Sequence, residues 1–401
     1  MLQLDLMQTL AFAGVVLFVG HGLCRAIPVL HRYNLPAPII GGLLVAAASL
    51  LANQLGVRLF EFDTTLQGPL MVGFFCTIGL GASVSMLRVG GRQVIWMFVI
   101  ASLFALAQNL IGAAVASTFG LSPLVGVLAG SVTLTGGPAT GLAFAPLFEE
   151  SGILGAGSIA IAMAMAGIVT GGLVGGPVST FLIERRRLAP AERPTLPAHG
   201  LTSGGPAADA DGAADESHGS LKSIVVILVA MWLGAWLSRA GAAMGLTLPA
   251  TIGAMLAGAV VRNLDDATGW IRLAPRAIEN VGAVALSLFL ALALMTLDLS
   301  KLAGLAVPLL TILVVQVLVV ASVCIWPVFQ VMGRDYQSAV MCGGFIGFML
   351  GTTANAMAVM RTLTERYGPA PRAFLVAPMV GAFFVDFSNA LIITGLLNVW
   401  R

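Results

Sequence analysis

The chain reads AGSVTLTGGPATG at residues 129–141 and CGGFIGFMLGTTANA at residues 342–356. Each is the centre of a longer apolar stretch, 122–148 and 336–360, which glycine, serine and threonine interrupt too often for a plain transmembrane helix. Glycine lets the backbone turn sharply, and Pro138 cannot lie inside a continuous helix without removing a hydrogen bond. Non-helical backbone survives at membrane depth only where protein or a watery cavity satisfies it. We therefore predict one re-entrant hairpin in each stretch.

The composition is that of a membrane protein. Of the 401 residues, 58% are hydrophobic and 9% are charged, against roughly a quarter charged in a soluble domain. The formal net charge of +2 gives no basic surplus for nucleic acid, so we expect no nucleic-acid partner. The apolar residues fall in blocks of about 17 to 28, long enough to cross a hydrocarbon core of about 30 Å as helices. We predict an all-α polytopic membrane protein in contact with the lipid bilayer.

Ten apolar blocks outside the two hairpins are predicted to span the membrane. They lie near residues 8–24, 36–53, 67–87, 94–118, 155–183, 222–240, 248–262, 280–298, 303–331 and 373–399. Cytoplasmic loops carry an excess of lysine and arginine, so the distribution of these residues between the two sides tests the number of spans. With the N-terminus outside, 16 of the 20 basic residues fall on the inner side, and only Arg58, Arg239, Lys301 and Arg401 fall outside. This split favours an even number of spans and both termini outside.

The chain divides into two similar halves. Residues 184–221 are rich in Ala, Pro, Gly and Asp and are predicted to form a disordered cytoplasmic linker between residues 1–183 and 222–401. PAPIIGGLLVA at 36–46 is matched by LPATIGAMLAGAV at 248–260, and each match is followed by a glutamine-containing span and a hairpin. Five spans per half is an odd number, so the second half enters the membrane from the opposite side. We predict two inverted five-span repeats, an arrangement typical of secondary transporters.

The hairpins carry the candidate binding groups. Two half-helices that end near the bilayer centre offer unpaired N–H groups to a carboxylate, and hydroxyl and carbonyl oxygens to sodium. The candidates in the first hairpin are Ser131, Thr133, Thr135, Gly136, Gly137 and Thr140, and those in the second are Gly351, Thr352, Thr353 and Asn355. The alternative for each residue is that small side chains only let helices pack closely.

Asp386 is the one acidic residue well inside a predicted span, and Asn389 follows one turn later on the same helix face. A carboxylate in hydrocarbon costs at least about 2.5 kcal/mol, so Asp386 is expected to face a hydrated or protein-lined site. We expect a cation or hydrogen-bond donors beside it. The alternative is a structural carboxylate that accepts hydrogen bonds from a hairpin.

Other chemistry finds little support in the sequence. The four histidines lie at span ends or in the linker, the four cysteines show no metal-ligand spacing, and no GxxxxGK[ST] motif for ATP occurs. We therefore expect no enzyme activity, no catalytic residue and no organic cofactor.

The sequence resembles the bacterial sodium/glutamate symporters over nearly its whole length outside the linker. The matching motifs include GPLMVGFFCTIGL (68–80), QNLIG (108–112), LSPLVGVLAGSVTLTGG (121–137) and AFLVAPMVGAFFVDFSNA (373–390). The resemblance implies ten spans with two re-entrant hairpins, a homodimer in the bacterial inner membrane with both termini periplasmic, and sodium-driven symport of L-glutamate by an elevator-like movement. It assigns the hairpin residues above and Asn389 to substrate binding and Asp386 to sodium.

Both hairpin tips depart from the family pattern. Residues 136–140 read GGPAT where relatives read GGHGT, and residues 351–356 read GTTANA where GATPTA is usual. Another amino acid or a dicarboxylate is therefore kept as an alternative substrate. An ion channel with a filter made of the hairpins and a membrane scaffold that transports nothing are the alternative functions.

Overall fold

The computed structural model describes residues 2–28, 30, 35–57, 59–89, 91–188, 210–243, 248–297 and 304–400. The first half contains β1 (Leu2–Leu4), α1 (Leu6–Ala26), α3 (Ala37–Gln54), β2 (Phe60–Phe62), α4 (Gln67–Gly81), α5 (Val84–Val89), α6 (Gly91–Thr118), α7 (Pro123–Val127), the π-helical turn η1 (Leu128–Val132), α8 (Gly137–Glu150) and α9 (Ala156–Arg185). The second half contains α10 (Ala210–Ala243), α11 (Ala250–Thr268), α12 (Pro275–Met295), α13 (Ala306–Val323), η3 (Cys324–Val328), α14 (Phe329–Met332), α15 (Tyr336–Met349), α16 (Thr353–Tyr367), α17 (Pro371–Met379), η4 (Val380–Phe384) and α18 (Val385–Trp400).

The protein is an all-helical polytopic membrane protein apart from the two three-residue strands. Among the described residues, eight helical segments are long and apolar enough to cross a membrane. They begin with α1, α3, α6, α9, α10, α12, α13 and α17, and the segments that begin with α13 and α17 run on to Met332 and Trp400.

Two of the ten predicted spans are not among these eight segments. The predicted span 67–87 is broken at Ala82, so α4 has only 15 residues and α5 follows as a separate short helix. The predicted span 248–262 corresponds to α11, which carries Arg262 and two aspartates in its last two turns and is therefore less apolar.

Helix also occupies both ends of the predicted linker 184–221. The helix α9 continues to Arg185 and α10 begins at Ala210, while residues 189–209 lie outside the described residues.

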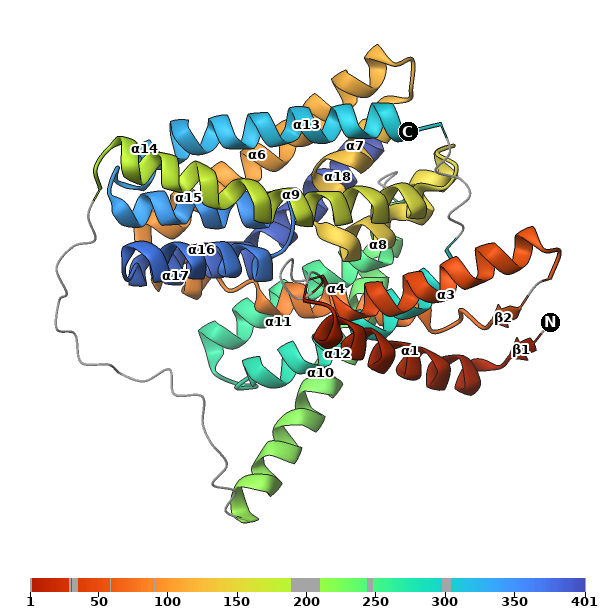
Figure 1. Ribbon diagram of the computed structural model, residues 1–401. Helices are drawn as coiled ribbons and strands as arrows, with labels where there is room; N and C mark the ends of the chain where they lie inside the picture. Colours follow the sequence, from red (N-terminus) through yellow and green to blue (C-terminus); the bar gives the residue numbers. More distant parts are fainter. Residues whose placement is uncertain are drawn as a thin grey trace.

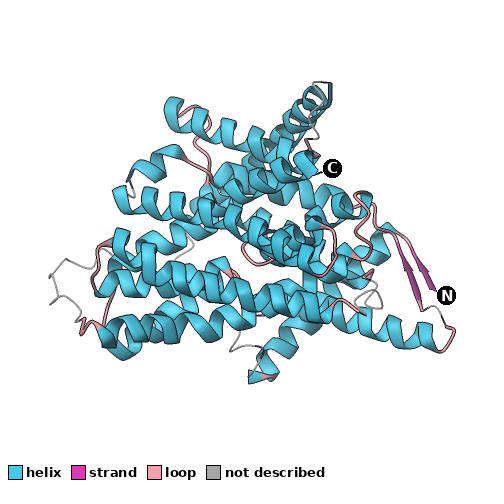
Figure 2. Cartoon of the chain, turned by 90° about the horizontal axis from the view of Figure 1, so that it is seen from above, coloured by secondary structure: helices cyan, strands magenta, loops and turns pink. Residues whose placement is uncertain are grey.

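The helices form two groups, which Figure 1 shows one above the other. The hairpin group contains α6 to α9 and α13 to α18, and the companion group contains α1, α3, α4, α10, α11 and α12. Within the companion group α4 packs on both α11 and α12, and α3 packs on α12. Contacts of α12 with α8, and of α18 with α4 and α11, join the two groups. Figure 2 shows the same bundle from above.

Glycine sets the closest helix contact of the companion group. A Cβ atom added to Gly79 of α4 would lie 1.9 Å from the carbonyl oxygen of Met255 in α11. A Cβ atom added to Gly258 of α11 would lie 2.6 Å from the carbonyl oxygen of Cys76 in α4. The two backbones therefore touch, which is the contact that small residues permit between membrane helices.

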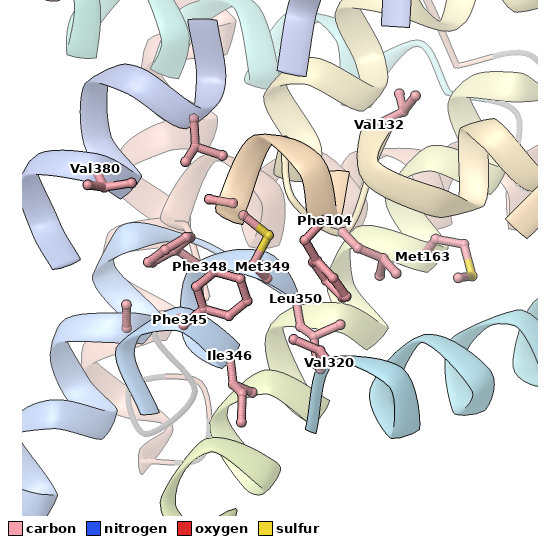
Figure 3. Close-up of a cluster of buried hydrophobic side chains, with 14 of the residues drawn as sticks. Phe104, Val132, Met163, Val320, Phe345, Ile346, Phe348, Met349, Leu350 and Val380 are labelled. Atoms are coloured by element: carbon pink, nitrogen blue, oxygen red, sulfur yellow. The ribbon is translucent and has the colours of Figure 1, made fainter. Parts of the chain in front are cut away.

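The core of the hairpin group surrounds α15. Phe345 and Phe348 pack at 5.3 Å between ring centroids, and Phe104 of α6 packs on Phe345 at 5.8 Å. Figure 3 shows these rings with Met349 and Val320 of α13 in one buried cluster. The end of α15 is thus held between helices from both halves of the chain.

The two strands tie the N-terminus to the loop before α4. β1 pairs in parallel with β2, so that Leu2 lies opposite Phe60 and Leu4 opposite Phe62. The ring of Phe12 in α1 packs against Phe60 and Phe62 at 5.3 and 5.7 Å. Residues about sixty positions apart thereby share one small sheet.

Candidate functional site

The first predicted hairpin is a broken helix. It begins with Ser122, whose hydroxyl caps α7, and continues through η1, where Gly130 leaves the helical region at φ −92° and ψ −130°. The chain then turns and starts α8 at Gly137, which has a φ of +66°. We call residues 133–137 the first tip.

The second predicted hairpin consists of α15 and α16, which pack against each other. The helix α15 ends at Met349, and Thr352 caps α16 by accepting a hydrogen bond from the amide of Asn355 at 3.3 Å. We call residues 350–352 the second tip. The two tips meet, because a Cβ atom on Gly137 would lie 3.6 Å from the carbonyl oxygen of Gly351.

A cavity of about 400 Å³ lies where the tips face the companion group. Both groups of helices line it. The hairpin group contributes Thr135, Gly136, Gly137, Pro138, Ala139, Thr140, Phe348, Gly351, Thr352, Thr353, Ala354, Gly381, Ala382, Val385 and Asp386. The companion group contributes Pro36, Pro38, Phe74, Leu286, Ser287 and Leu290.

Eight of the twelve predicted site residues line this one cavity. They are Thr135, Gly136, Gly137, Thr140, Gly351, Thr352, Thr353 and Asp386. The structure thus brings residues from the first tip, the second tip and the last helix together, although up to about 250 positions separate them in the sequence.

Ser131 and Asn389 do not line the cavity. They bond to each other in the buried interior: the Ser131 hydroxyl donates to Asn389 Oδ1 at 2.6 Å, and Asn389 Nδ2 donates to the Ser131 carbonyl at 3.0 Å. Asn109 of α6 completes the cluster by accepting from the Ser131 amide at 2.9 Å. These bonds hold the break at η1 against α6 and α18.

Thr133 and Asn355 also lie outside the cavity wall. The Thr133 hydroxyl donates to the carbonyl of Leu128 at 2.8 Å, so it satisfies backbone within its own broken helix. Asn355 Nδ2 donates to the carbonyl of Ile168 in α9 at 2.8 Å. Both side chains therefore stabilise the hairpins through hydrogen bonds to backbone carbonyl groups outside the cavity.

Asp386 is the one charged side chain among the residues that line the cavity. Within the described part of the chain, it has no hydrogen-bond or ion-pair partner, so its carboxylate is available to a bound group. The threonine hydroxyls of both tips and Ser287 add neutral oxygens to the same space. Carboxylate and neutral oxygens are ligands for a hard cation or for a substrate ammonium group.

The described residues contain no group of three or more His, Cys, Asp or Glu side chains that could hold a metal ion. The donor set at the cavity consists of oxygen atoms and lacks thiolate and imidazole. It therefore fits sodium better than a transition metal.

Ser287 and the two rings Phe74 and Phe348 are cavity residues that the sequence analysis missed. Ser287 is an isolated serine in the apolar helix α12, and the two phenylalanines resemble ordinary core residues. The sequence offers no signal for these three positions. Phe74 and Ser287 reach the cavity only because α4 and α12 face the tips, and Phe348 lies at the end of α15 beside the second tip.

Known proteins resemble this chain over nearly its whole length. The family model "Sodium/glutamate symporter" matches residues 2–369. The sodium/glutamate symporters of Escherichia coli K12 and Shigella flexneri are each 40% identical to it over 98% of this chain and 97% of theirs. The sodium/glutamate symporter of Haemophilus influenzae Rd is 38% identical over 96% of this chain and 95% of its own. The chain therefore belongs to the sodium/glutamate symporter family.

Proposed function

We propose that the protein couples the transport of L-glutamate to the movement of sodium across the membrane. The observation that carries this proposal is the carboxylate of Asp386, which has no partner among the described residues and lies in a cavity formed by both tips. The relatives of the chain are sodium/glutamate symporters. Asp386 binds sodium, and the uncharged oxygens around it complete the shell of ligands.

The tips bind the substrate in this proposal. Thr352 in the second tip, and Thr140 and Thr353 beside the tips, offer hydroxyl groups to the carboxylates of glutamate, and the glycines allow the backbone to approach them. The Thr135 hydroxyl donates its proton to Gln108 Oε1, so Thr135 offers an acceptor oxygen to the ammonium group of the substrate. Ser131, Thr133, Asn355 and Asn389, predicted as substrate ligands, support the tips through the bonds described above.

We further propose two inverted repeats, 1–183 and 222–401, each with five spans and one re-entrant hairpin. The α4 and α11 segments complete the ten spans. The packing supports this assignment because it occurs in matched pairs: α1 with α3 and α10 with α11, then α3 with α12 and α11 with α4. The helices α3 and α11 also both begin directly after a proline, Pro36 and Pro249.

We also propose transport by an elevator-like movement, which the position of the cavity supports. Because the hairpin group carries most of the lining and the companion group closes one side, a displacement of one group along the other would open the cavity to either face of the membrane. The hairpin group moves across the membrane either with substrate and sodium bound or with the site empty, and the companion group stays in place.

The protein is proposed to lie in the bacterial inner membrane with both termini periplasmic. The strand β1 and the end of α18 lie in the right-hand half of Figure 1, whereas the end of α9 that leads to the linker lies at the opposite side. The distribution of lysine and arginine supports this orientation.

A homodimer is proposed through the outer face of α10. Trp232 and Trp236 lie near the middle of this span, are 62% and 63% exposed, and pack on each other at 6.4 Å between ring centroids. Tryptophan in a membrane helix is normally enriched at the two interfaces rather than at mid-span. A second copy of the chain would cover this face.

The test of the proposed function is uptake of labelled L-glutamate into proteoliposomes. An inward sodium gradient is compared with a potassium gradient, and unlabelled aspartate, glutamine and citrate serve as competitors. Saturable accumulation that needs sodium and is blocked by glutamate supports the symporter. Uptake of another competitor in place of glutamate would show that the altered motifs GGPAT and GTTANA bind a different substrate. Flux without saturation or counterflow would indicate a channel.

A further inference from the structure

One buried side chain connects the two tips. Gln108 lies in α6 and is fully buried. Its Oε1 atom accepts a hydrogen bond from the hydroxyl of Thr135 in the first tip at 2.5 Å. Its Nε2 atom donates to the carbonyl of Met349, the last residue of α15 before the second tip, at 3.0 Å. A single amide group therefore contacts both hairpins at once.

We propose that Gln108 is a positioning residue that sets the distance between the tips, and that this distance selects the chain length of the amino-acid substrate. The inference rests on the proposed function. Gln108 does not line the cavity, so it acts through Thr135 and through the residues that follow Met349. Aspartate and glutamate differ by one methylene group, so the spacing of the hydroxyls on the two tips discriminates between them.

An amide is suited to this position because it is an acceptor and a donor in one flat group. The Thr135 hydroxyl also lies 3.3 Å from the Met349 carbonyl, so hydroxyl, amide and carbonyl form a closed set of contacts. Loss of the Gln108 amide would leave the Met349 carbonyl and the Thr135 hydroxyl with each other alone. Each buried hydrogen bond contributes roughly 0.5–1.5 kcal/mol to stability. Without the amide, the Thr135 hydroxyl and the Met349 carbonyl are no longer held at their present separation.

Gln316 provides a matched control within the same chain. It is the corresponding amide in α13 and is also fully buried. Its Nε2 atom donates to the backbone carbonyl of Gln108 at 2.6 Å, and its Oε1 atom has no partner among the described residues. Gln316 therefore supports α6 and, among the described residues, makes no hydrogen bond to either tip.

The apolar cluster next to Gln108 is expected to accept an apolar side chain of the same length. Phe104, one turn earlier in α6, packs against Phe345, one turn before Met349 in α15, and Figure 3 shows both in the buried cluster. Gln108→Met removes both hydrogen bonds with little change of volume. Gln108→Asn keeps the amide but is one methylene too short to reach both partners.

The experiment compares the wild type, Gln108→Met, Gln108→Asn and Gln316→Met in proteoliposomes under a sodium gradient. KM and maximal rate are measured for glutamate, aspartate and 2-aminoadipate. Both Gln108 variants are expected to raise the KM for glutamate about tenfold and to bring the preference for glutamate over aspartate close to one, with a smaller change in maximal rate. Gln316→Met is expected to keep the wild-type preference.

An unchanged preference in folded Gln108 variants would overturn the inference, and so would an equal loss of preference in Gln316→Met. Size-exclusion chromatography in detergent establishes folding, and Gln108→Asn serves where Gln108→Met does not fold. A wild type without sodium-dependent uptake overturns the proposed function, and with it the inference. Normal wild-type uptake with unaltered selectivity in the variants overturns the inference alone.

Discussion

Asp386 is the residue on which sodium coupling is proposed to depend. Asp386→Asn keeps the size and one oxygen of the side chain but removes the charge that favours a cation. Hydrogen bonds and contacts to charged groups contribute about 1.5–3 kcal/mol, so the half-saturating sodium concentration for uptake is expected to rise about 10- to 100-fold. Uptake is measured in proteoliposomes at increasing sodium.

Asp63→Asn is the control for this substitution. Asp63 lies in the loop before α4, accepts a hydrogen bond from the amide of Thr65 and does not line the cavity. It should leave the sodium dependence as in the wild type. Ordinary sodium dependence in Asp386→Asn would rule out the assignment of Asp386.

Asp335 links stability to pH at the start of α15. Its Oδ1 atom accepts from the amide of Ser338 at 2.8 Å, and Arg372 Nη2 lies 2.5 Å from its Oδ2 atom. Burial raises the pKa of Asp335, but the bonds from Ser338 and the Arg372 guanidinium outweigh it and hold the pKa below its ordinary 3.8. The folded state therefore favours the carboxylate, and this stabilisation is present above pH 3.8 and is lost as the pH falls through the folded pKa.

Asp335→Ala is accordingly expected to lower the free energy of unfolding at pH 7 by about 1 kcal/mol through loss of the helix cap. The half-exposed ion pair adds little. The difference in Tm from the wild type, measured in detergent, should shrink as the pH is lowered from 5 to 3. Asp335→Asn keeps the capping acceptor and should retain most of the stability at pH 7. A Tm difference that stays constant across this range would contradict the role of the charge.

At the scale of the element, α4 depends on its glycine contact with α11. Gly79→Ala places a methyl group against the Met255 carbonyl, and overpacking of this kind costs typically about 1–3 kcal/mol. The variant is expected to have a lower Tm in detergent than the wild type. Gly73→Ala in the same helix is the control, because its Cβ atom would meet only the sulfur of Met231 at 3.7 Å. Equal Tm values for the two variants would show that the helices can separate at little cost.

Most helices could be predicted from the sequence, but their interruptions could not. Hydropathy located the long apolar helices because each apolar block exceeds the membrane thickness. The break after α4 has a distant cause: Asn263 in α11 donates to the Ala82 carbonyl at 3.0 Å and accepts from the Val84 amide at 2.9 Å. Such a contact between residues about 180 positions apart has no local pattern.

The cavity residues also divide into those that the local sequence indicates and those that depend on distant contacts. The threonines and glycines of the tips could be predicted because they cluster in segments that cannot be plain helices. Ser131 and Asn389 have the same chemistry but bond to each other, which only the packing of η1 on α18 decides. Ser287 reaches the cavity from the other helix group and carries no signal in its own segment.

At the scale of the whole molecule, the exposed tryptophans of α10 allow a test of the proposed homodimer. Replacement of Trp232 and Trp236 by alanine is expected to weaken the dimer at least tenfold, because buried tryptophans often contribute 2 kcal/mol or more to an interface. Single-molecule photobleaching in liposomes at decreasing protein density measures the fraction of dimers. Trp270→Ala is the control, since Trp270 is 91% exposed in the loop between α11 and α12. A dimer fraction equal to that of the wild type would place the interface elsewhere.

The small sheet of β1 and β2 has a consequence for the order of synthesis. The ribosome completes Phe62 only after both α1 and α3 have been made, so β1 cannot pair with β2 before that point. The strands can pair only when these two helices lie in the membrane in opposite directions, with the chain start and the later loop on the same side. Closing of the sheet therefore requires that the first pair of helices has inserted in opposite directions.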